Sequence, residues 1–320
     1  MERKIVMVMP NLTAELKACI ESEAVSLGFV PYFFKTPEDA EETVKDAEIL
    51  FGNVPGLCAH ASGLKWMCTA NAGVEPYLKP GVLPTPETVL TNSSGAYGVT
   101  IAEHIVMVTL EMMRREAEYR EIVKAHTWKR DLKISSIYDS RITMLGTGDI
   151  GRKAAVRLRG FGPKCIVGIS RSGRRVPEMD QNYTVEALDR ILPETDLLIM
   201  SLPGTQETMH IMNEARLRKL PETAYLVNVG RGNAIDQAAL EQCLRGERLA
   251  GAALDVFETE PVPADASIWS CPHLHITPHT AGNMTLTHTV RFIVEQFLTN
   301  LQNYAAGRPM NAVVDRQMGY

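Results

Sequence analysis

The sequence has no apolar run of membrane-spanning length, because the stretch from Ile101 to Leu110 is too short and carries Glu103 and His104. Its first residues, MERKIVMVMP, are charged and then strand-like, without the apolar core and cleavage site of a signal peptide. Internal repeats and low-complexity segments are also missing. These absences predict a cytoplasmic protein with no membrane partner.

An excess of basic residues is missing too. The chain has 33 Lys and Arg against 38 Asp and Glu, which gives a net charge of −5. The chain therefore has no excess positive charge to neutralise a phosphate backbone, and we expect no nucleic-acid partner. The six cysteines are scattered without CxxC spacing, which favours reduced thiols in a cytoplasm.

What is present is an ordinary globular composition of 45% apolar and 22% charged residues over 320 positions, a length that predicts two domains. Apolar runs typical of strands alternate with segments of helical periodicity, which predicts an α/β fold of parallel sheets with helices on their faces. In the first part we expect strands at 4–9, 30–34, 48–51, 64–68 and 89–92, and helices at 13–27 and 38–46. In the second part we expect strands at 142–145, 165–169, 196–200, 225–228, 250–256 and 275–277, and helices at 184–191, 214–220, 237–245 and 285–306.

A glycine-rich turn follows the predicted strand at 142–145 and opens a segment of helical periodicity. It reads Gly146-Thr147-Gly148-Asp149-Ile150-Gly151. The first glycine permits a tight turn, the second lets the backbone approach a pyrophosphate, and the third lets the helix pack closely on the strand. The N–H groups at the start of that helix then face the phosphates. The turn predicts a dinucleotide-binding Rossmann domain in which these six residues bind the cofactor.

A long helix is expected from Val99 to about His126. Its stretch IAEHIVMVTLEMM is apolar around most of its circumference, so one neighbouring layer would not cover it. We therefore expect it to be buried between domains or at a subunit interface, and we predict a homodimer built around Val99–Met113. His104 lies on this helix, and we interpret it as a structural histidine rather than a catalytic one.

Three polar side chains follow strands of the second part. Arg231 comes directly after AYLVNV, Glu260 ends DVFETE, and His279 follows HIT, so all three belong at the sheet edge that holds the glycine turn. A guanidinium holds a carboxylate and polarises a carbonyl, a histidine gives a proton to a developing alkoxide, and a carboxylate orients that histidine. This catalytic set suits hydride transfer from a nicotinamide to a 2-oxo acid.

Several motifs occur in order along the chain: NAGVE, SSGAYGVTIAEH, GTGDIG, LPGTQETMHIMN, NVGRGNAID, LDVFETEP and ITPHTAG. Together they resemble the D-isomer-specific 2-hydroxyacid dehydrogenase family. The resemblance implies that Arg231 binds the substrate, that His279 is the acid/base and that Glu260 is its partner. It implies that backbone amides of Ala72 and Gly73 hold the substrate carboxylate, and that Asp255 lies near the nicotinamide carboxamide. Further cofactor contacts are implied at Leu202, Pro203, Thr208, Val229, Gly230, His279 and Gly282.

The family fold also implies a split first domain. Residues 1–97 plus 285–320 would form a flavodoxin-like substrate-binding domain, residues 98–284 the Rossmann domain, and the cleft between them the active site. Trp128 resembles a family tryptophan that reaches toward the partner's active site, and packing at the interface is the alternative interpretation. The side-chain pocket has candidates that name no substrate: Phe51, Asn53, Val54 and Tyr97.

The cofactor-binding part departs from the family pattern at one strand end. NAD-using members carry an acidic residue after the second strand for the ribose hydroxyls, whereas this chain reads Gly168-Ile169-Ser170-Arg171-Ser172-Gly173-Arg174-Arg175. A 2′-phosphate would find charge-assisted hydrogen bonds there. We predict a preference for NADPH, with NADH as the alternative cofactor, carried by Ser170, Arg171, Ser172 and Arg174.

The function predicted is the reduction of a small 2-oxo acid to a D-2-hydroxy acid, and the runner-up is a glyoxylate/hydroxypyruvate reductase. A nucleotide-sensing module like the family's corepressor relatives is less favoured, because the chain lacks long interaction tails and keeps the Arg-Glu-His set. A metal site at His273, His275 and His279 is also weighed. It is disfavoured because His279 has a catalytic role and no cysteine pair is near, so no metal is predicted.

Overall fold

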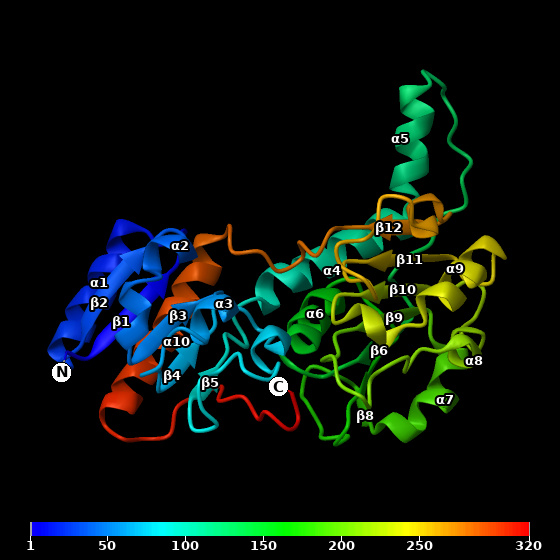
Figure 1. Ribbon diagram of the computed structural model, residues 1–320. Coiled ribbons are helices and arrows are strands. Elements are labelled where there is room, and N and C mark those ends of the chain that lie inside the picture. The colour runs from blue at the N-terminus through cyan, green and yellow to red at the C-terminus, as the bar shows by residue number, and fades with distance from the viewer. Residues whose placement is uncertain (1, 320) are drawn as a thin grey trace. The chain divides into compact units, whose positions relative to one another are not determined.

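The computed structural model describes residues 2–319 and divides into two compact units (Figure 1). Unit 1 combines the chain up to Tyr97 with the chain from Asn283 onward, and unit 2 is Gly98–Gly282. The chain therefore returns from unit 2 to unit 1 between residues 282 and 283, whereas the sequence predicted this boundary between residues 284 and 285. In both units a parallel sheet carries helices, which confirms the predicted fold class.

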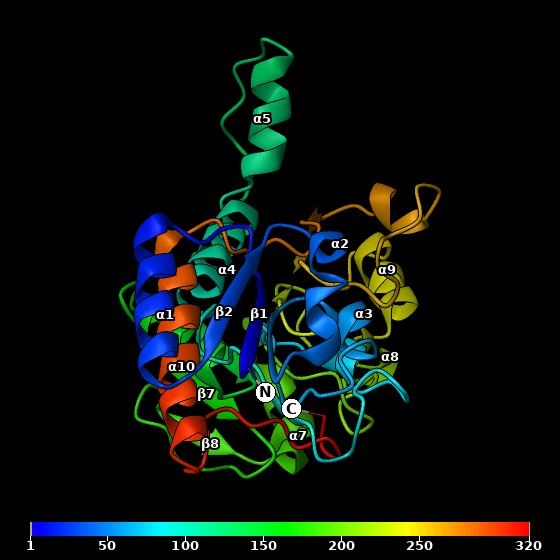
Figure 2. The same cartoon turned by 60° about the vertical axis from the view of Figure 1, so that its left-hand side comes forward.

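Unit 1 is built on a five-stranded parallel sheet in the order β2-β1-β3-β4-β5. Figure 2 shows α1 and α10 side by side on one face of this sheet. The expected helix at 38–46 is shorter, because it becomes a 3₁₀ turn over Thr43–Asp46. The elements are β1 (Lys4–Val8), α1 (Ala14–Ser26), β2 (Val30–Phe34), α2 (Pro37–Ala40), β3 (Ile49–Gly52), α3 (Pro55–Cys58), β4 (Trp66–Cys68), β5 (Val89–Thr91) and α10 (Thr287–Ala305).

The C-terminal helix completes the core of unit 1. The ring of Phe297 on α10 stacks on Phe51 of β3 with centroids 4.3 Å apart and on Trp66 of β4 at 5.3 Å. All three side chains are fully buried. Burial of this much aromatic surface accounts for the docking of a helix that begins almost two hundred residues after β5.

Unit 2 is built on a seven-stranded parallel sheet in the order β12-β11-β10-β9-β6-β7-β8. The order reverses between β9 and β6, and in such sheets ligands bind at the carboxyl ends of the strands beside this point. The sequence did not predict β8, a polar three-residue strand that pairs with β7 at the sheet edge. The elements are α4 (Gly98–Met113), α5 (Glu116–Lys124), β6 (Arg141–Leu145), α6 (Asp149–Arg159), β7 (Cys165–Ile169), β8 (Gln181–Tyr183), α7 (Leu188–Ile191), β9 (Leu197–Met200), α8 (Glu214–Leu217), β10 (Tyr225–Asn228), α9 (Gln237–Arg245), β11 (Gly251–Leu254) and β12 (Leu274–Ile276).

The expectation of one helix from Val99 to His126 is wrong. The helix ends at Met113, whose carbonyl accepts a hydrogen bond from the N–H of Ser135 at 2.8 Å. Arg115 has a φ of 57°, which turns the chain before α5 begins. Within unit 2, α4 packs against α6, β10 and β11, so part of its apolar surface is covered inside one chain.

Beyond that break the chain forms an arm, residues 116–136, that projects from the rest of unit 2 (Figure 1). No side chain of α5 is buried. Large apolar side chains on the arm are exposed, with Val123 at 72% and Trp128 at 93%. Within residues 2–319, no helix combines the length and the hydropathy that crossing a membrane requires.

Candidate active site

The glycine turn connects β6 to α6, and its first and third glycines are required by the chain itself. Gly146 has a φ of 110°, and a Cβ there would lie 2.8 Å from the carbonyl oxygen of Ser201. A Cβ on Gly151 would overlap the carbonyl oxygen of Gly146. A Cβ on Gly148 would meet nothing within 4 Å, so packing does not explain that glycine. A glycine there leaves room for a ligand to approach the backbone closely.

The first turn of α6 has the donors that a pyrophosphate needs. Gly148 caps the helix without a side-chain hydrogen bond, and the N–H groups of the first turn have no intrahelical acceptor. The carboxylate of Asp149 in that turn forms an ion pair with Lys153, with 2.8 Å between Oδ1 and Nζ. The backbone of the predicted residues Thr147 and Ile150 frames the same turn. These residues fit a bound dinucleotide phosphate.

The turn after β7 is basic at its surface. Ser170 Oγ accepts the N–H of Gly173 at 3.2 Å, and Ser172 Oγ accepts the N–H of Arg174 at 3.3 Å, so both serines shape the turn. The side chains of Arg171, Arg174 and Arg175 are exposed.

The carboxylates nearest in sequence to this turn are held by arginines of α6. Arg152 donates two hydrogen bonds to Glu178 Oε1, at 2.9 and 2.7 Å, and Arg159 pairs with Asp180 at 2.9 Å. The hydrogen bonds from Arg152 lower the pKa of Glu178. Both acids therefore have arginine partners on α6.

The loops after β9 and β10 carry further residues of the predicted cofactor set. Thr208 Oγ1 donates to the carbonyl oxygen of Pro203 at 2.7 Å and accepts the N–H of Thr205 at 2.9 Å, which closes the loop after β9 on itself. Gly230 lies against this loop, because a Cβ there would be 2.6 Å from the backbone N and O of Leu202. Val229, before it, is buried.

His279 and Glu260 form a hydrogen-bonded pair. Glu260 Oε2 lies 2.7 Å from His279 Nδ1, and Glu260 Oε1 accepts the N–H of Phe257 at 2.8 Å. The carboxylate is thus fixed at both oxygens, and it fixes one nitrogen of the imidazole. The other ring nitrogen, Nε2, remains for a substrate, and the histidine side chain is 54% exposed.

Asp255 holds the loop that carries His279. Its carboxylate accepts hydrogen bonds from the Thr277 hydroxyl at 2.6 Å, the Thr280 N–H at 2.9 Å and the Ala281 N–H at 3.0 Å. Its carbonyl oxygen accepts the N–H of His279, whose φ is 52°. Asp255 is only 3% exposed. The left-handed backbone at His279 is therefore secured by one buried acidic residue.

Arg231 lies on the loop after β10, beside the loops just described. The side-chain amide of Asn228 donates to the carbonyl oxygen of Arg231 at 2.9 Å and accepts the N–H of Gly230 at 3.1 Å. A Cβ on Gly232 would overlap the backbone of Phe257, so the loops after β10 and β11 are in direct contact. The structure thus brings Arg231 to the same edge as His279. The sequence pattern did not identify Asn228 and Thr277, whose side chains hold these loops, although Asn228 ends the buried strand β10 and Thr277 directly follows the half-buried strand β12.

The remaining histidines of interest have protein partners. His104 Nε2 lies 3.3 Å from Thr277 Oγ1, and burial lowers the pKa of His104. Because Thr277 donates to Asp255, the neutral imidazole is the donor to Thr277. His275 Nδ1 lies 3.7 Å from Glu111 Oε2. Across residues 2–319, no group of three His, Cys, Asp or Glu side chains is placed to hold a metal ion, and the cysteines are free thiols.

The predicted carboxylate-binding loop lies in unit 1, after β4. The side-chain amide of Asn92 donates to the carbonyl oxygen of Ala72 at 2.9 Å, and the N–H of Ser93 donates to the carbonyl oxygen of Asn71 at 2.9 Å. The backbone N–H groups of Ala72 and Gly73 have no acceptor among the described residues. Two donors are therefore open at the carboxyl edge of this sheet.

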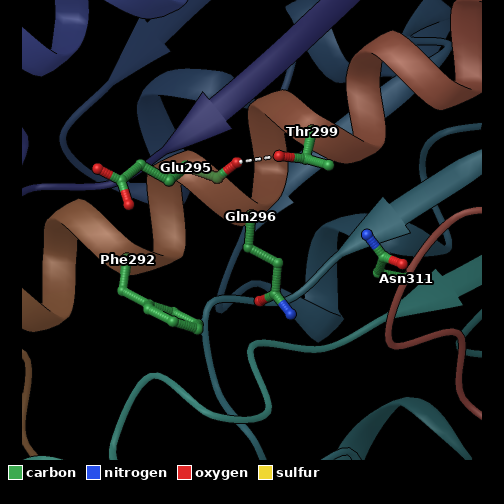
Figure 3. Close-up of a pocket in the computed structure, with 5 residues that line it drawn as sticks. All are labelled: Phe292, Glu295, Gln296, Thr299 and Asn311. Atoms are coloured by element: carbon green, nitrogen blue, oxygen red, sulfur yellow. Dashed lines mark hydrogen bonds between the residues drawn. The ribbon is translucent and has the colours of Figure 1, made fainter.

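A separate hollow of about 340 Å³ lies in unit 1 along α10 (Figure 3). Figure 3 shows that its lining comes from α10 and from the C-terminal tail, and none of these residues belongs to the predicted site. The residues that line it are Phe292, Glu295, Gln296, Thr299 and Asn311.

The chain is similar to proteins of one known family. The family model described as "D-isomer specific 2-hydroxyacid dehydrogenase, NAD binding domain" matches residues 106–281. A glyoxylate/hydroxypyruvate reductase A of Klebsiella pneumoniae is 30% identical over 262 residues, which cover 80% of this chain and 82% of that protein.

Solved structures are also similar to this chain. A D-isomer specific 2-hydroxyacid dehydrogenase family protein from Aeromonas salmonicida is 31% identical, with a TM-score of 0.89 over 99% of this chain and 100% of that one. An NADPH-dependent glyoxylate/hydroxypyruvate reductase from Sinorhizobium meliloti, in complex with NADP and sulfate, is 27% identical, with a TM-score of 0.83 over the full length of both chains.

Proposed function

The chain belongs to the D-isomer specific 2-hydroxyacid dehydrogenase family, and from this premise we propose that it reduces a short 2-oxo acid to the D-2-hydroxy acid, with NADPH as the hydride donor. The observation that carries the proposal is the His279–Glu260 pair at 2.7 Å, on a sheet edge that also holds Arg231 and the glycine turn. Names of relatives favour glyoxylate and hydroxypyruvate as the substrates.

The residues divide the chemistry among them. When bound, the nicotinamide supplies a hydride to the carbonyl carbon of the substrate. Arg231 holds the substrate carboxylate and polarises its carbonyl. His279 gives the Nε2 proton to the carbonyl oxygen as the hydroxyl forms, and Glu260 stabilises the imidazolium through Nδ1. Hydride and proton together convert the 2-oxo group into a 2-hydroxy group.

An assay of NADPH oxidation with glyoxylate and hydroxypyruvate tests this proposal. The His279→Ala variant is expected to lose roughly 10² to 10⁴ in kcat, because it lacks the general acid. Arg231→Ala is expected to raise KM and lower kcat, and Glu260→Gln to lower kcat, because the imidazole loses the charged partner that orients it. His60→Ala, at an exposed position of unit 1, is the control. A His279→Ala enzyme with normal turnover would overturn the assignment, and cofactor binding without turnover in the unmodified protein would favour a nucleotide sensor.

The preference for NADPH is the finer part of the proposal. It is supported by the exposed arginines after β7, by the absence of an acid from Ser170 to Arg175, and by the pairing of Glu178 with Arg152. The ratio of kcat/KM for NADPH to that for NADH is expected to fall about tenfold in Arg171→Ala, because a charge-assisted hydrogen bond to the 2′-phosphate is lost. Arg218→Ala, at an exposed arginine directly after α8, is the matched control. Equal values of kcat/KM for NADPH and NADH in the unmodified enzyme would refute the preference.

The last part of the proposal is a homodimer. Its support is now the arm, since α4 is partly covered within one chain while Val123, Trp128 and Ile134 on the arm are exposed. A second copy of the chain is the occupant that would cover these side chains.

A further inference from the structure

Three side chains form a hydrogen-bonded ring beside the carboxylate-binding loop. The Thr69 hydroxyl donates to Asn53 Oδ1 at 2.9 Å, and Asn53 Nδ2 donates to Asn71 Oδ1 at 2.8 Å. The backbone N–H of Asn71 donates back to Thr69 Oγ1 at 3.2 Å. Thr69 is fully buried, whereas Asn71 is exposed.

A tyrosine holds the backbone on both sides of Asn53. The Tyr77 hydroxyl accepts the N–H of Val54 at 3.0 Å and donates to the carbonyl oxygen of Gly52 at 3.2 Å, so it binds the backbone on both sides of Asn53. Burial raises the pKa of Tyr77, which keeps this hydroxyl protonated. The orientation of Asn53 is therefore determined by the fold.

The ring decides which group Asn71 presents. Its side-chain oxygen is occupied by Asn53, so the Asn71 Nδ2 group points out of the ring as a donor. Among the described residues this amide group has no acceptor. Its neighbours in the chain are the open N–H groups of Ala72 and Gly73. Three donors on consecutive residues therefore follow β4, and the acceptor oxygens of the ring are already used within it.

When the two backbone N–H groups hold a carboxylate, the Asn71 amide remains available for another acceptor of the same substrate. We propose that the Asn71 amide binds a hydroxyl oxygen on the carbon next to the carbonyl, and that the enzyme therefore prefers 3-hydroxylated 2-oxo acids to their unsubstituted analogues. The inference rests on the proposed function and adds a specificity-determining residue to it. A site that hydrogen-bonds a substrate hydroxyl rejects the analogue that lacks it, because the donor is then left unpaired.

Hydroxypyruvate and pyruvate are the matched pair of substrates, since they differ only in this hydroxyl. The unmodified enzyme with NADPH is expected to show a higher kcat/KM for hydroxypyruvate. In Asn71→Ala the ratio of the two values is expected to fall about tenfold, with kcat/KM for pyruvate almost unchanged. Asn53→Ala, which releases the orientation of the amide, is expected to lower the ratio by a smaller factor. Asn303→Ala on α10 is the control and leaves the ratio unchanged.

Two outcomes overturn the inference. An Asn71→Ala enzyme that loses the same factor on both substrates would show that the amide serves the shared carboxylate or the fold. An unchanged ratio would show that the amide does not contact the hydroxyl. Both outcomes leave the proposed function standing, provided that the unmodified enzyme reduces either acid. If it reduces neither acid nor glyoxylate, the proposed function itself fails.

Discussion

Single buried polar residues position the candidate catalytic groups in unit 2. Asp255 accepts three hydrogen bonds from the loop 277–281, and Asn228 spans the loop that carries Arg231. They hold His279 and Arg231 in place before a substrate binds, which is how a fold contributes precision to catalysis.

Asp255→Asn tests this bracing role. The amide cannot accept all three hydrogen bonds, so we expect the free energy of unfolding to fall by roughly 1–3 kcal/mol and kcat to fall about 10²-fold. Urea unfolding and the NADPH assay measure the two effects. The exposed Asp131→Asn is the control. A variant with normal kcat would mean that the loop holds His279 without Asp255.

His104 makes stability depend on pH. Burial lowers its pKa while Asp255 and Glu111 partly oppose this, so the folded protein binds fewer protons at this site than the unfolded chain does. The contribution of His104 to the free energy of unfolding should therefore be fully present above the ordinary histidine pKa of about 6.5. It should be lost as the pH drops below that value, by at most about 1.4 kcal/mol per pH unit.

Urea unfolding of His104→Gln between neutral and mildly acidic pH checks this expectation. Glutamine keeps a donor for Thr277 but does not titrate, so the pH dependence should become shallower than in the unmodified protein. His60→Gln, at an exposed position, is the comparison. Identical slopes for His104→Gln and the unmodified protein would contradict the expectation.

At the scale of elements, α10 shows how a distant segment completes a domain. One side of this helix buries Phe297 between Phe51 and Trp66, and Phe292 of the same helix lines the hollow in Figure 3. The same substitution, Phe to Ala, can therefore be compared at a buried and at a less buried position of one helix.

Phe297→Ala is expected to lower the free energy of unfolding by about 3–5 kcal/mol, because it removes a stacked ring from a closed core. Phe292→Ala should cost clearly less. Urea unfolding of both variants gives the comparison. Equal losses would mean that helix propensity, rather than the stacked rings, determines how α10 contributes.

At the scale of the whole molecule, the arm carries large apolar side chains that no other part of the chain within residues 2–319 covers. Trp128 is 93% exposed and Val123 72%. Side chains of this size rarely face water in a group unless a partner covers them.

Light scattering at micromolar concentration tests the homodimer. We expect twice the chain mass of 35.4 kDa for the unmodified protein. The double variant Val123→Ser, Trp128→Ala should shift the population toward the monomer, whereas Trp269→Ala, at a half-exposed tryptophan outside the arm, should not. A monomeric mass for the unmodified protein would refute the dimer.

The sequence by itself determined the parallel α/β architecture and the main residues of the candidate site. The reason is that these features are local. Apolar runs and helical periodicity show where strands and helices lie, and in a parallel sheet the residues after each strand gather at one edge. Arg231, Glu260 and His279 could therefore be assigned to one edge from their positions after three strands.

Only the tertiary structure decided which atoms meet and where regular elements stop. Asn53 and Asn71 are 18 residues apart, Asp255 and Thr280 are 25 apart, and Arg152 and Glu178 are 26 apart, so no local pattern pairs them. The strand β8 is polar, and it forms through backbone pairing with the neighbouring strand β7. At the end of α4 the carbonyl oxygen of Met113 accepts the N–H of Ser135, which lies 22 residues further along, at the far end of the arm. In each case the deciding partner lies elsewhere in the chain, and folding alone brings it near.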